Sequence, residues 1–350
     1  MKHPVTAALA PIAAAAALSL FSACVKRDAQ TNSSPGTSIG VFVPGVMSGS
    51  PVYEMLVEGV RAAADRYSAA HAGTAPVEVI VIEGGYNQAE WETKLTAMTA
   101  SRSYDLIVSS NPSLPDIVSH ISAQFPDQYF LLLDGQLEGN PHVYTLRYNQ
   151  REQSYMAGYM AALVSEAADR ASPRRVGLVA AQEYPVMNNV ILPGFLEGAR
   201  AVHSGYTVDF RIVGNWYDAA KAGELAADMI QGGVRVLLCR AGGANEGGIR
   251  AADEAGARVI WFDTNGYGIR PGIVAGSSVL HQNQAAYTQV LRYLEGTLTF
   301  GIAETMGVRE GYVDFIQDDP VYIETVSPEL REQQASMIER IRSGTLALPL

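Results

Sequence analysis

The stretch Ser38–Val60, SIGVFVPGVMSGSPVYEMLVEGV, shows the pattern that the rest of the chain repeats. An apolar run ends at Pro44, a short Gly/Ser loop follows, and an amphipathic segment begins at Pro51. This order predicts a strand, a loop and a helix, because proline is well tolerated in the first turn of a helix. In open α/β sheets ligands bind beyond the carboxyl ends of the strands, so the loop is expected to line a binding cleft.

The glycines of this loop do not form a phosphate-binding motif. Gly45 and Gly49 match neither GxGxxG nor a P-loop, and no Gly-Lys-Ser/Thr follows them. The chain has 350 residues, 48% of them hydrophobic, which is enough for one large core or two medium ones. Its net charge of −11 argues against nucleic acid as a partner and permits a neutral or weakly polar small ligand.

The N-terminus reads as a targeting segment, with a signal peptide over residues 1–23. Lys2 and His3 precede an Ala-rich apolar run that is too short to favour a permanent membrane span. Small residues stand directly before Cys24 in Leu-Phe-Ser-Ala-Cys, which resembles a relaxed bacterial lipobox. Lipidation of Cys24 would anchor the protein to a bacterial membrane, with residues 24–37 as a polar tether. The alternative is an ordinary secreted protein with an incidental cysteine.

Apolar runs and amphipathic segments alternate along the remaining chain. Strands are expected at Val77–Ile82, Tyr104–Ser109, Tyr129–Leu133, Val143–Tyr148, Val176–Ala180, Tyr206–Ile212, Val234–Leu238, Arg258–Phe262, Ile273–Val279 and Tyr312–Ile316. Helices are expected at Gln88–Ser101, Leu114–Gln124, Arg151–Ala168, Val186–Val202, Ala219–Ile230, Gly247–Ala255, Gln284–Leu294 and Pro328–Arg342. Near-continuous apolar strands are typical of parallel sheets covered on both faces. The only cysteine besides Cys24, Cys239, lies in such a run and reads as a buried small hydrophobe.

The alternation runs twice, with a break near residues 148–175, which predicts an α/β fold of two doubly wound lobes. Three separated segments of the second half, beginning VGLVAAQEYPVMNN, NWYDAAKAGELAAD and VIWFDTNG, resemble the basic membrane protein (BMP) family of transporter lipoproteins. The family includes spirochaetal receptors for purine nucleosides and for riboflavin. The resemblance implies a type I periplasmic-binding-protein fold, a solute receptor for an ABC importer, and no catalysis. It also implies that lobe 1 spans residues 38–148 plus about 282–308, and lobe 2 residues 149–281 plus about 309–350.

The resemblance also suggests site residues. Tyr53 matches the family's aromatic ring after the first strand, and Trp216, in Asn-Trp-Tyr-Asp, matches a second ring in lobe 2. Asp263 matches a carboxylate that binds sugar hydroxyls, with Asn265 in place of a second acid, and His281 stands where a lysine is usual. The first loop lacks the family's acidic run. Tyr53 and Trp216 would clamp a planar ring, although each could instead be ordinary packing.

Further candidates come from positions at strand ends. Asp134 directly follows a buried strand, where it could accept hydrogen bonds from a ligand or simply brace the loop. Asn111 could pair with a heterocycle edge or form an Asx turn before Pro112. The candidate ligand-binding residues are Tyr53, Trp216, Asp263, Asp134, Asn111, Asn188, Gln182, Arg147, Tyr148, Asn265 and His281.

No His pair or cysteine cluster has metal-site spacing, no dinucleotide fingerprint or GxSxG occurs, and no cofactor is expected. The sequence predicts a lipid-anchored receptor on the periplasmic side of a membrane, working with an ABC permease. Riboflavin is the first expected ligand, because the indole of Trp216 offers a wide stacking face and the first loop is uncharged. A purine nucleoside is the alternative, and a nucleoside-processing enzyme is the alternative of a different class.

Overall fold

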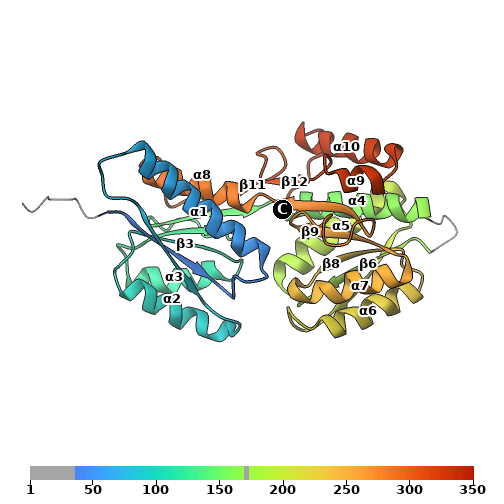
Figure 1. Ribbon diagram of the computed structural model, residues 1–350, viewed down its shortest axis with the longest axis horizontal. Coiled ribbons are helices and arrows are strands. Elements are labelled where there is room, and N and C mark those ends of the chain that lie inside the picture. The colour runs from blue at the N-terminus through green and yellow to red at the C-terminus, as the bar shows by residue number, and fades with distance from the viewer. Residues whose placement is uncertain (1–35, 169–172) are drawn as a thin grey trace, which may run out of the picture.

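The computed structural model describes residues 36–168 and 173–350, folded into two α/β lobes that lie side by side (Figure 1). The signal peptide, Cys24 and most of the expected tether therefore lie outside the described residues. None of the helices in the described ranges is long and apolar enough to cross a membrane.

Lobe 1 is built on a six-stranded sheet in the order β11-β5-β4-β3-β1-β2, in which all strands are parallel. Its strands are β1 (Ser38–Val43), β2 (Glu78–Glu83), β3 (Leu106–Ser110), β4 (Tyr129–Leu133), β5 (Val143–Tyr148) and β11 (Ala303–Met306). Helices α1 (Pro51–Ala70) and α8 (Gln282–Leu294) pack together on one face. The short η1 (Gln88–Glu90), α2 (Trp91–Ala100) and α3 (Leu114–Gln124) cover the other (Figure 1).

Lobe 2 repeats this plan with the order β12-β10-β9-β8-β6-β7. Its strands are β6 (Arg175–Ala180), β7 (Thr207–Ile212), β8 (Val236–Arg240), β9 (Arg258–Asp263), β10 (Val274–Leu280) and β12 (Val313–Phe315), of which β12 is antiparallel. Helices α4 (Gln150–Ala168), α5 (Leu192–Val202), α9 (Pro320–Thr325) and α10 (Pro328–Arg342) lie above the sheet in Figure 1, and α6 (Ala219–Gln231) and α7 (Asn245–Ala255) below it.

The burial of the strands agrees with their near-continuous apolar sequences. All five residues of β3 and all seven of β10 are buried, as expected for strands with helices on both faces. At about 25 cal/mol per Å² of apolar surface, burying each Leu or Ile side chain stabilises the fold by roughly 1.5–3 kcal/mol. The expected α/β fold of two doubly wound lobes is therefore confirmed.

Several element boundaries differ from the sequence expectation by one or two residues, and a few elements differ in kind or were not expected. The helix expected from Val186 contains a π-helical turn, Met187–Ile191, before α5 begins. Strand β8 begins at Val236 and runs two residues further than expected, to Arg240. The four-residue β11 and six-residue α9 were not expected, because such short elements carry too little periodicity to be recognised.

Three crossovers join the lobes. They follow β5, β10 and β11, and they lead into α4, α8 and β12. The crossovers also bond to each other: the N–H of Asn149 donates to the Met306 carbonyl at 2.8 Å, and the N–H of His281 donates to the Tyr312 carbonyl at 3.0 Å. The C-terminal segment docks on the same place, since the Asn149 amide donates to the Leu348 carbonyl at 3.2 Å. The hinge is thus one hydrogen-bonded bundle.

Candidate functional site between the lobes

Two aspartates occupy matching places in the two lobes. Asp134 directly follows β4, the fourth strand of lobe 1, and Asp263 ends β9, the fourth strand of lobe 2. Both have left-handed backbone conformations, with φ of 54° and 73°, and Arg102 is the only other such non-glycine residue in the described ranges. This conformation costs an L-residue about 1–2 kcal/mol. Strain of this kind at strand ends is found where a side chain must be aimed for function.

The first turn of α4 contacts both aspartates. Gln150 donates from Nε2 to Oδ1 of Asp134 at 3.1 Å, and Gln153 donates from Nε2 to Oδ1 of Asp263 at 3.2 Å. Residues three apart share one face of a helix, which is why two glutamines of one turn can reach carboxylates of different lobes. The Oε1 atoms of both glutamines are buried and have no hydrogen-bond partner among the described residues. Buried polar atoms are normally paired, so these two oxygens indicate a place for a ligand or water.

Arg240 is a site residue that the sequence reasoning missed. It ends β8, its Nη1 donates to Oδ2 of Asp263, and its guanidinium carbon lies 4.9 Å from the centroid of the Phe262 ring. Its Nε is buried and unpaired within the described part of the chain. The signal was present in the sequence: an arginine closing an apolar strand directly before Ala-Gly-Gly. The apolar run predicts a strand end at Leu238, two residues before Arg240.

The electrostatics of these groups extend across the lobes. Burial raises the pKa of Asp134 to about 7; Arg240 opposes this rise, and the nearby charge of Asp263 adds to it. The pKa of Arg240 is raised, because Asp263, Tyr184 and Asp134 together outweigh the burial that would lower it. The site therefore contains one firm ion pair in lobe 2 and, in lobe 1, a carboxyl that titrates near neutral pH.

Tyr53 and Asn111 belong to one network at the edge of lobe 1. The Tyr53 hydroxyl donates to the Pro44 carbonyl at 2.9 Å and accepts from the Asn111 amide at 3.3 Å. The Asn111 oxygen also accepts from the Ser113 N–H at 2.9 Å, which is the Asx turn considered from the sequence. Burial, opposed by the Asn111 hydrogen bond and helped by Asp134, raises the pKa of Tyr53 to about 12. The ring is thus fixed within electrostatic reach of Asp134.

Trp216 is presented by a local turn. The Asn215 side chain accepts from the N–H groups of Tyr217 and Asp218, and Asp218 caps α6 by accepting from the Lys221 N–H at 2.9 Å. These bonds leave the Trp216 side chain 38% exposed, with its ring centroid 6.3 Å from that of Tyr184. A large, partly exposed indole beside a tyrosine suits stacking on a planar ligand. The clamp of Trp216 with Tyr53 remains a prediction.

Two predicted residues lie at the hinge side of lobe 1. Tyr148 is buried, and its hydroxyl donates to Oε1 of Gln282 at 3.2 Å. Gln282 in turn accepts from Ser110 and donates to the Val52 carbonyl, so this network ties β3, β5 and α8 to the start of α1. Arg147 points elsewhere: its Nε donates to the Thr305 hydroxyl of the edge strand β11 at 2.9 Å.

Three of the remaining predicted residues of lobe 2, Asn188, Asn265 and His281, have protein partners. Asn188 donates to Glu183 at 2.9 Å within the loop and π-turn that follow β6, and the partly buried Gln182 lies in the same loop. The amide of Asn265 is exposed and donates to Asp319 at 3.0 Å. His281 stands at the N-cap position of α8 without a capping side-chain bond, and it bonds to Asp314; this bond lowers the Asp314 pKa against the opposing effect of burial. Asn265 and His281 are thus bonded to the segment after β11, and neither bonds to the Asp263 cluster.

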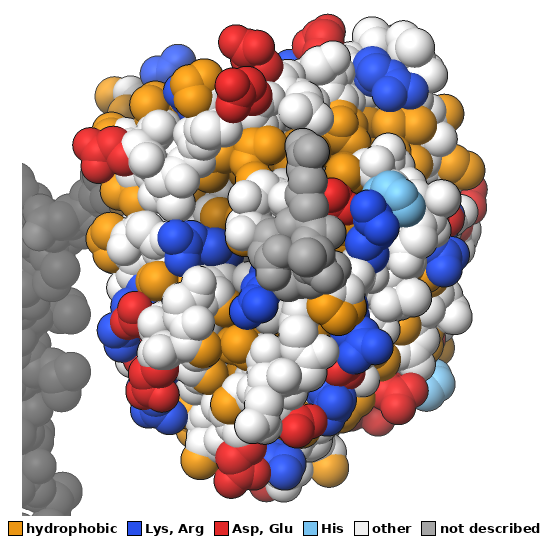
Figure 2. All heavy atoms as spheres, turned by 90° about the vertical axis from the view of Figure 1, so that its right-hand side faces the viewer, with side chains coloured by type: hydrophobic (Ala, Val, Ile, Leu, Met, Phe, Trp, Pro, Cys, Tyr) orange, Lys and Arg blue, Asp and Glu red, His pale blue; other side chains and the backbone are white. Residues whose placement is uncertain are grey.

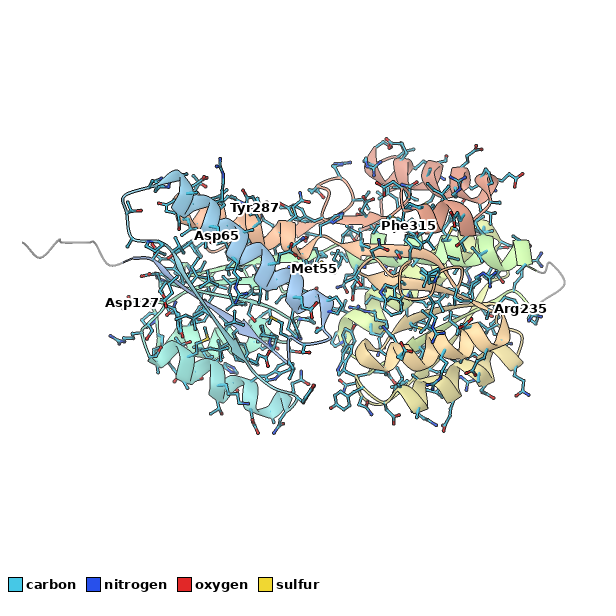
Figure 3. The ribbon with its side chains drawn as sticks, in the orientation of Figure 1. Met55, Asp65, Asp127, Arg235, Tyr287 and Phe315 are labelled. Atoms are coloured by element: carbon cyan, nitrogen blue, oxygen red, sulfur yellow. The ribbon has the colours of Figure 1, made fainter. Side chains whose placement is uncertain are left out.

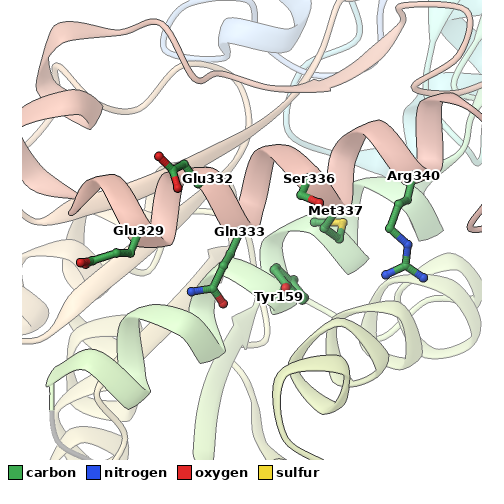
Figure 4. A pocket seen from close by; sticks show the side chains of 7 residues that line it. All are labelled: Tyr159, Glu329, Glu332, Gln333, Ser336, Met337 and Arg340. Carbon is green, nitrogen blue, oxygen red and sulfur yellow. The ribbon is translucent and has the colours of Figure 1, made fainter.

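Away from the candidate site, the described surface has a hollow and a face of mixed charge. A hollow of about 450 Å³ lies between α10 and α4, lined by Tyr159, Gln333 and Arg340 among others (Figure 4). On the outer end of lobe 2, acidic and basic side chains are interspersed (Figure 2). No group of three His, Cys, Asp or Glu side chains in residues 36–168 and 173–350 is placed to hold a metal ion.

Two similar lobes joined by three crossovers define the type I periplasmic-binding-protein fold. Residues 36–346 match the family model described as Bmp, ABC transporter substrate-binding protein PnrA-like. The chain therefore belongs to this family of extracytoplasmic, non-catalytic substrate-binding proteins of ABC transporters. Among solved structures, an ABC transporter solute-binding protein from Aeropyrum pernix K1 has 21% identity and a TM-score of 0.75, covering 89% of this chain and 94% of that one.

Two curated relatives match over part of the chain. The CD4+ T-cell-stimulating antigen of Listeria monocytogenes is 28% identical over 170 residues, which is 47% of this chain and 45% of that protein. The ABC transporter nucleoside-binding protein BmpA of Lactococcus lactis is 27% identical over 144 residues, 41% of this chain and 39% of that protein. These alignments span less than half of each curated relative.

Proposed function

We propose that this protein is the receptor of an ABC importer for purine nucleosides, which it binds between its two lobes. The observation that carries the proposal is the pair of strained aspartates, Asp134 and Asp263, each bonded to a glutamine of α4 whose amide oxygen is buried and unpaired. Carboxylates and amides of this kind suit ligands rich in hydroxyl and ring N–H groups. Nucleosides carry both.

The choice between nucleoside and flavin rests on two arguments. The wide indole of Trp216 and the uncharged first loop favour riboflavin. The relative from Lactococcus lactis is named as a nucleoside-binding protein, which favours the nucleoside. The site adds a fixed cation, Arg240, next to Asp263, and a sugar hydroxyl can both donate to the carboxylate and accept from the guanidinium. We therefore place purine nucleosides first.

The proposal includes a lipid anchor on Cys24 and delivery of the ligand to a membrane permease. Support comes from the sequence, where small residues precede Cys24 and a polar segment follows it. Expression of the full chain in a bacterium fed with labelled fatty acid tests the anchor. The wild-type protein should become labelled and partition into detergent, and Cys24→Ser should do neither; equal labelling of both would contradict the anchor.

Direct binding measurements test the ligand. The chain from Val25 onward is purified, unfolded and refolded to remove bound molecules, and titrated calorimetrically with inosine, guanosine, adenosine and riboflavin. We expect saturable one-to-one binding of purine nucleosides with Kd in the micromolar range or below. If the purified protein is yellow and binds riboflavin but no nucleoside, the proposed ligand is riboflavin instead of a purine nucleoside. Absence of binding to all four would refute the proposed function.

A further inference from the structure

The two lobes carry aspartates at matching strand ends. The neighbouring strand, however, ends in a different kind of residue in each lobe. The third strand of lobe 1 ends at Ser110, whose hydroxyl bonds to Gln282 in the hinge network at 3.0 Å. The third strand of lobe 2 ends at Arg240, whose side chain reaches Asp263. Among the described residues, therefore, only the lobe 2 aspartate has a cation from its own lobe. This asymmetry indicates that Asp263 is held in a defined position for a particular part of the ligand.

Both oxygens of Asp263 have a neighbour with an unused polar atom. Oδ2 accepts from Nη1 of Arg240, whose Nε–H has no partner among the described residues. Oδ1 accepts from Nε2 of Gln153, whose Oε1 is likewise without a partner in that part of the chain. The Arg240 side chain is only 12% exposed, and that of Asp263 17%. The carboxylate is therefore flanked by one free donor and one free acceptor.

A vicinal diol complements this arrangement. Each hydroxyl has one O–H donor and two acceptor lone pairs, and each carboxylate oxygen keeps lone-pair capacity beyond its present bond. One hydroxyl can donate to Asp263 while it accepts from the Nε–H of Arg240. Its neighbour on the sugar can donate to Oε1 of Gln153. Bonds of this kind to charged groups are stronger than neutral ones, so losing one hydroxyl removes a large share of affinity.

We propose that Arg240 is a specificity-determining residue of the site, which together with Asp263 and Gln153 recognises a vicinal diol and so selects ribonucleosides over deoxyribonucleosides. This inference rests on the proposed function. A competing role for Arg240 would be occlusion: the guanidinium would cover Asp263 and have to move away before a ligand could bind. The two roles predict opposite changes in affinity when the arginine is removed.

The test combines variants with modified ligands. Dissociation constants for inosine, 2′-deoxyinosine and 3′-deoxyinosine are measured on the wild type, Arg240→Lys, Arg240→Met and the control Arg211→Met, whose arginine pairs with Asp209 and Asp228 on β7 and α6. For the wild type we expect about 10- to 100-fold weaker binding of each deoxy analogue. In Arg240→Met, inosine should bind about 10- to 100-fold more weakly, and the ratio between inosine and one of its two deoxy analogues, the one that lacks the hydroxyl bound by Arg240, should fall to within about 3-fold. Arg240→Lys should lie between, and Arg211→Met should match the wild type.

Three outcomes would overturn the inference. Equal binding of inosine and both deoxy analogues by the wild type would show that the site does not recognise the diol. This measurement uses the wild type alone, so it does not depend on whether a variant folds. Inosine binding by Arg240→Met or Arg240→Lys at least as tight as by the wild type would show an occluding arginine. Binding of no nucleoside by the wild type would refute the proposed function as well, whereas nucleoside binding without diol preference would leave that function intact and refute this inference alone.

Discussion

Tyr86 and Tyr217 meet edge to face across the two lobes, with ring centroids 5.7 Å apart and an interplanar angle of 74°. Tyr86 follows β2 in lobe 1, and Tyr217 precedes α6 in lobe 2, so the pair spans the molecule away from the hinge bundle. Both rings are largely exposed, at 71% and 60%, and neither is part of a core. The pair is thus an aromatic contact between the lobes that lies outside the hinge bundle.

We expect Tyr86→Ala to favour the open arrangement of the lobes. An aromatic pair is worth about 0.5–1.5 kcal/mol beyond its buried area, so ligand affinity should fall about 2- to 12-fold, and the radius of gyration without ligand should increase. Calorimetry and small-angle X-ray scattering measure the two effects. Tyr67→Ala, which removes a stacked pair with His71 at the C-terminal end of α1, is the control and should change neither. Unchanged affinity and scattering in Tyr86→Ala would show that the pair does not hold the lobes.

Trp216→Ala should weaken ligand binding by about 1–3 kcal/mol, because a large aromatic contact at the centre of a site is lost. Its side chain is 38% exposed and held by the Asn215 turn, so the substitution should leave the melting temperature nearly unchanged. Trp216→Phe keeps a stacking ring and should retain most of the affinity. Titration calorimetry on the three proteins decides the point. Wild-type affinity in Trp216→Ala would place Trp216 outside the site.

Asp134 makes stability depend on pH. Its pKa in the folded protein is raised to about 7, from about 3.9 in an unfolded chain, so the folded state binds more protons between these values. This contribution to stability is present below about pH 4 and is lost as the pH rises towards 7. Asp134→Asn should therefore gain in stability over the wild type as the pH rises, with an advantage about 1–3 kcal/mol larger at pH 8 than at pH 5.

Urea unfolding at both pH values checks this difference. Asp127→Asn is the matched control, because Asp127 is exposed at the outer end of lobe 1 (Figure 3), and it should behave like the wild type at both pH values. A gain in stability for Asp134→Asn that is the same at pH 5 and pH 8 would contradict a titration of Asp134 in this range.

Glycines allow α4 and α5 to pack closely in lobe 2. A Cβ on Gly158 would lie 1.9 Å from the Phe195 carbonyl oxygen, and one on Gly198 2.1 Å from the Tyr155 carbonyl oxygen. Both contacts are with backbone, which cannot move aside without shifting a helix. Gly158→Ala should therefore destabilise the protein by about 1–3 kcal/mol in chemical unfolding. Gly268→Ala is the control: a Cβ there meets nothing within 4 Å, and its stability should be unchanged or slightly higher.

Much of the fold could be predicted from the sequence because its causes are local. Apolar runs bounded by glycine and proline predicted the strands, and their repetition after residue 148 predicted a second lobe. The cap at Asp218 and the Asx turn at Asn111 depend on neighbours only two or three residues away. The apolar runs also predict Asp134 and Asp263 at strand ends, and in the structure Asp134 directly follows β4 and Asp263 ends β9.

What only the tertiary structure decided is which of these side chains meet. Gln153 reaches Asp263 across 110 residues of sequence, and Arg240 reaches it from the neighbouring strand. Likewise, only packing turns the Asn265 amide to Asp319 and brings Tyr86 to Tyr217. The physical reason is that periodicity fixes which face of an element is buried, whereas the partner of a polar side chain depends on how strands, helices and lobes are placed against each other. The sequence thus determined two lobes with carboxylates at their strand ends, and the tertiary structure joined those carboxylates, through α4 and Arg240, into one candidate site.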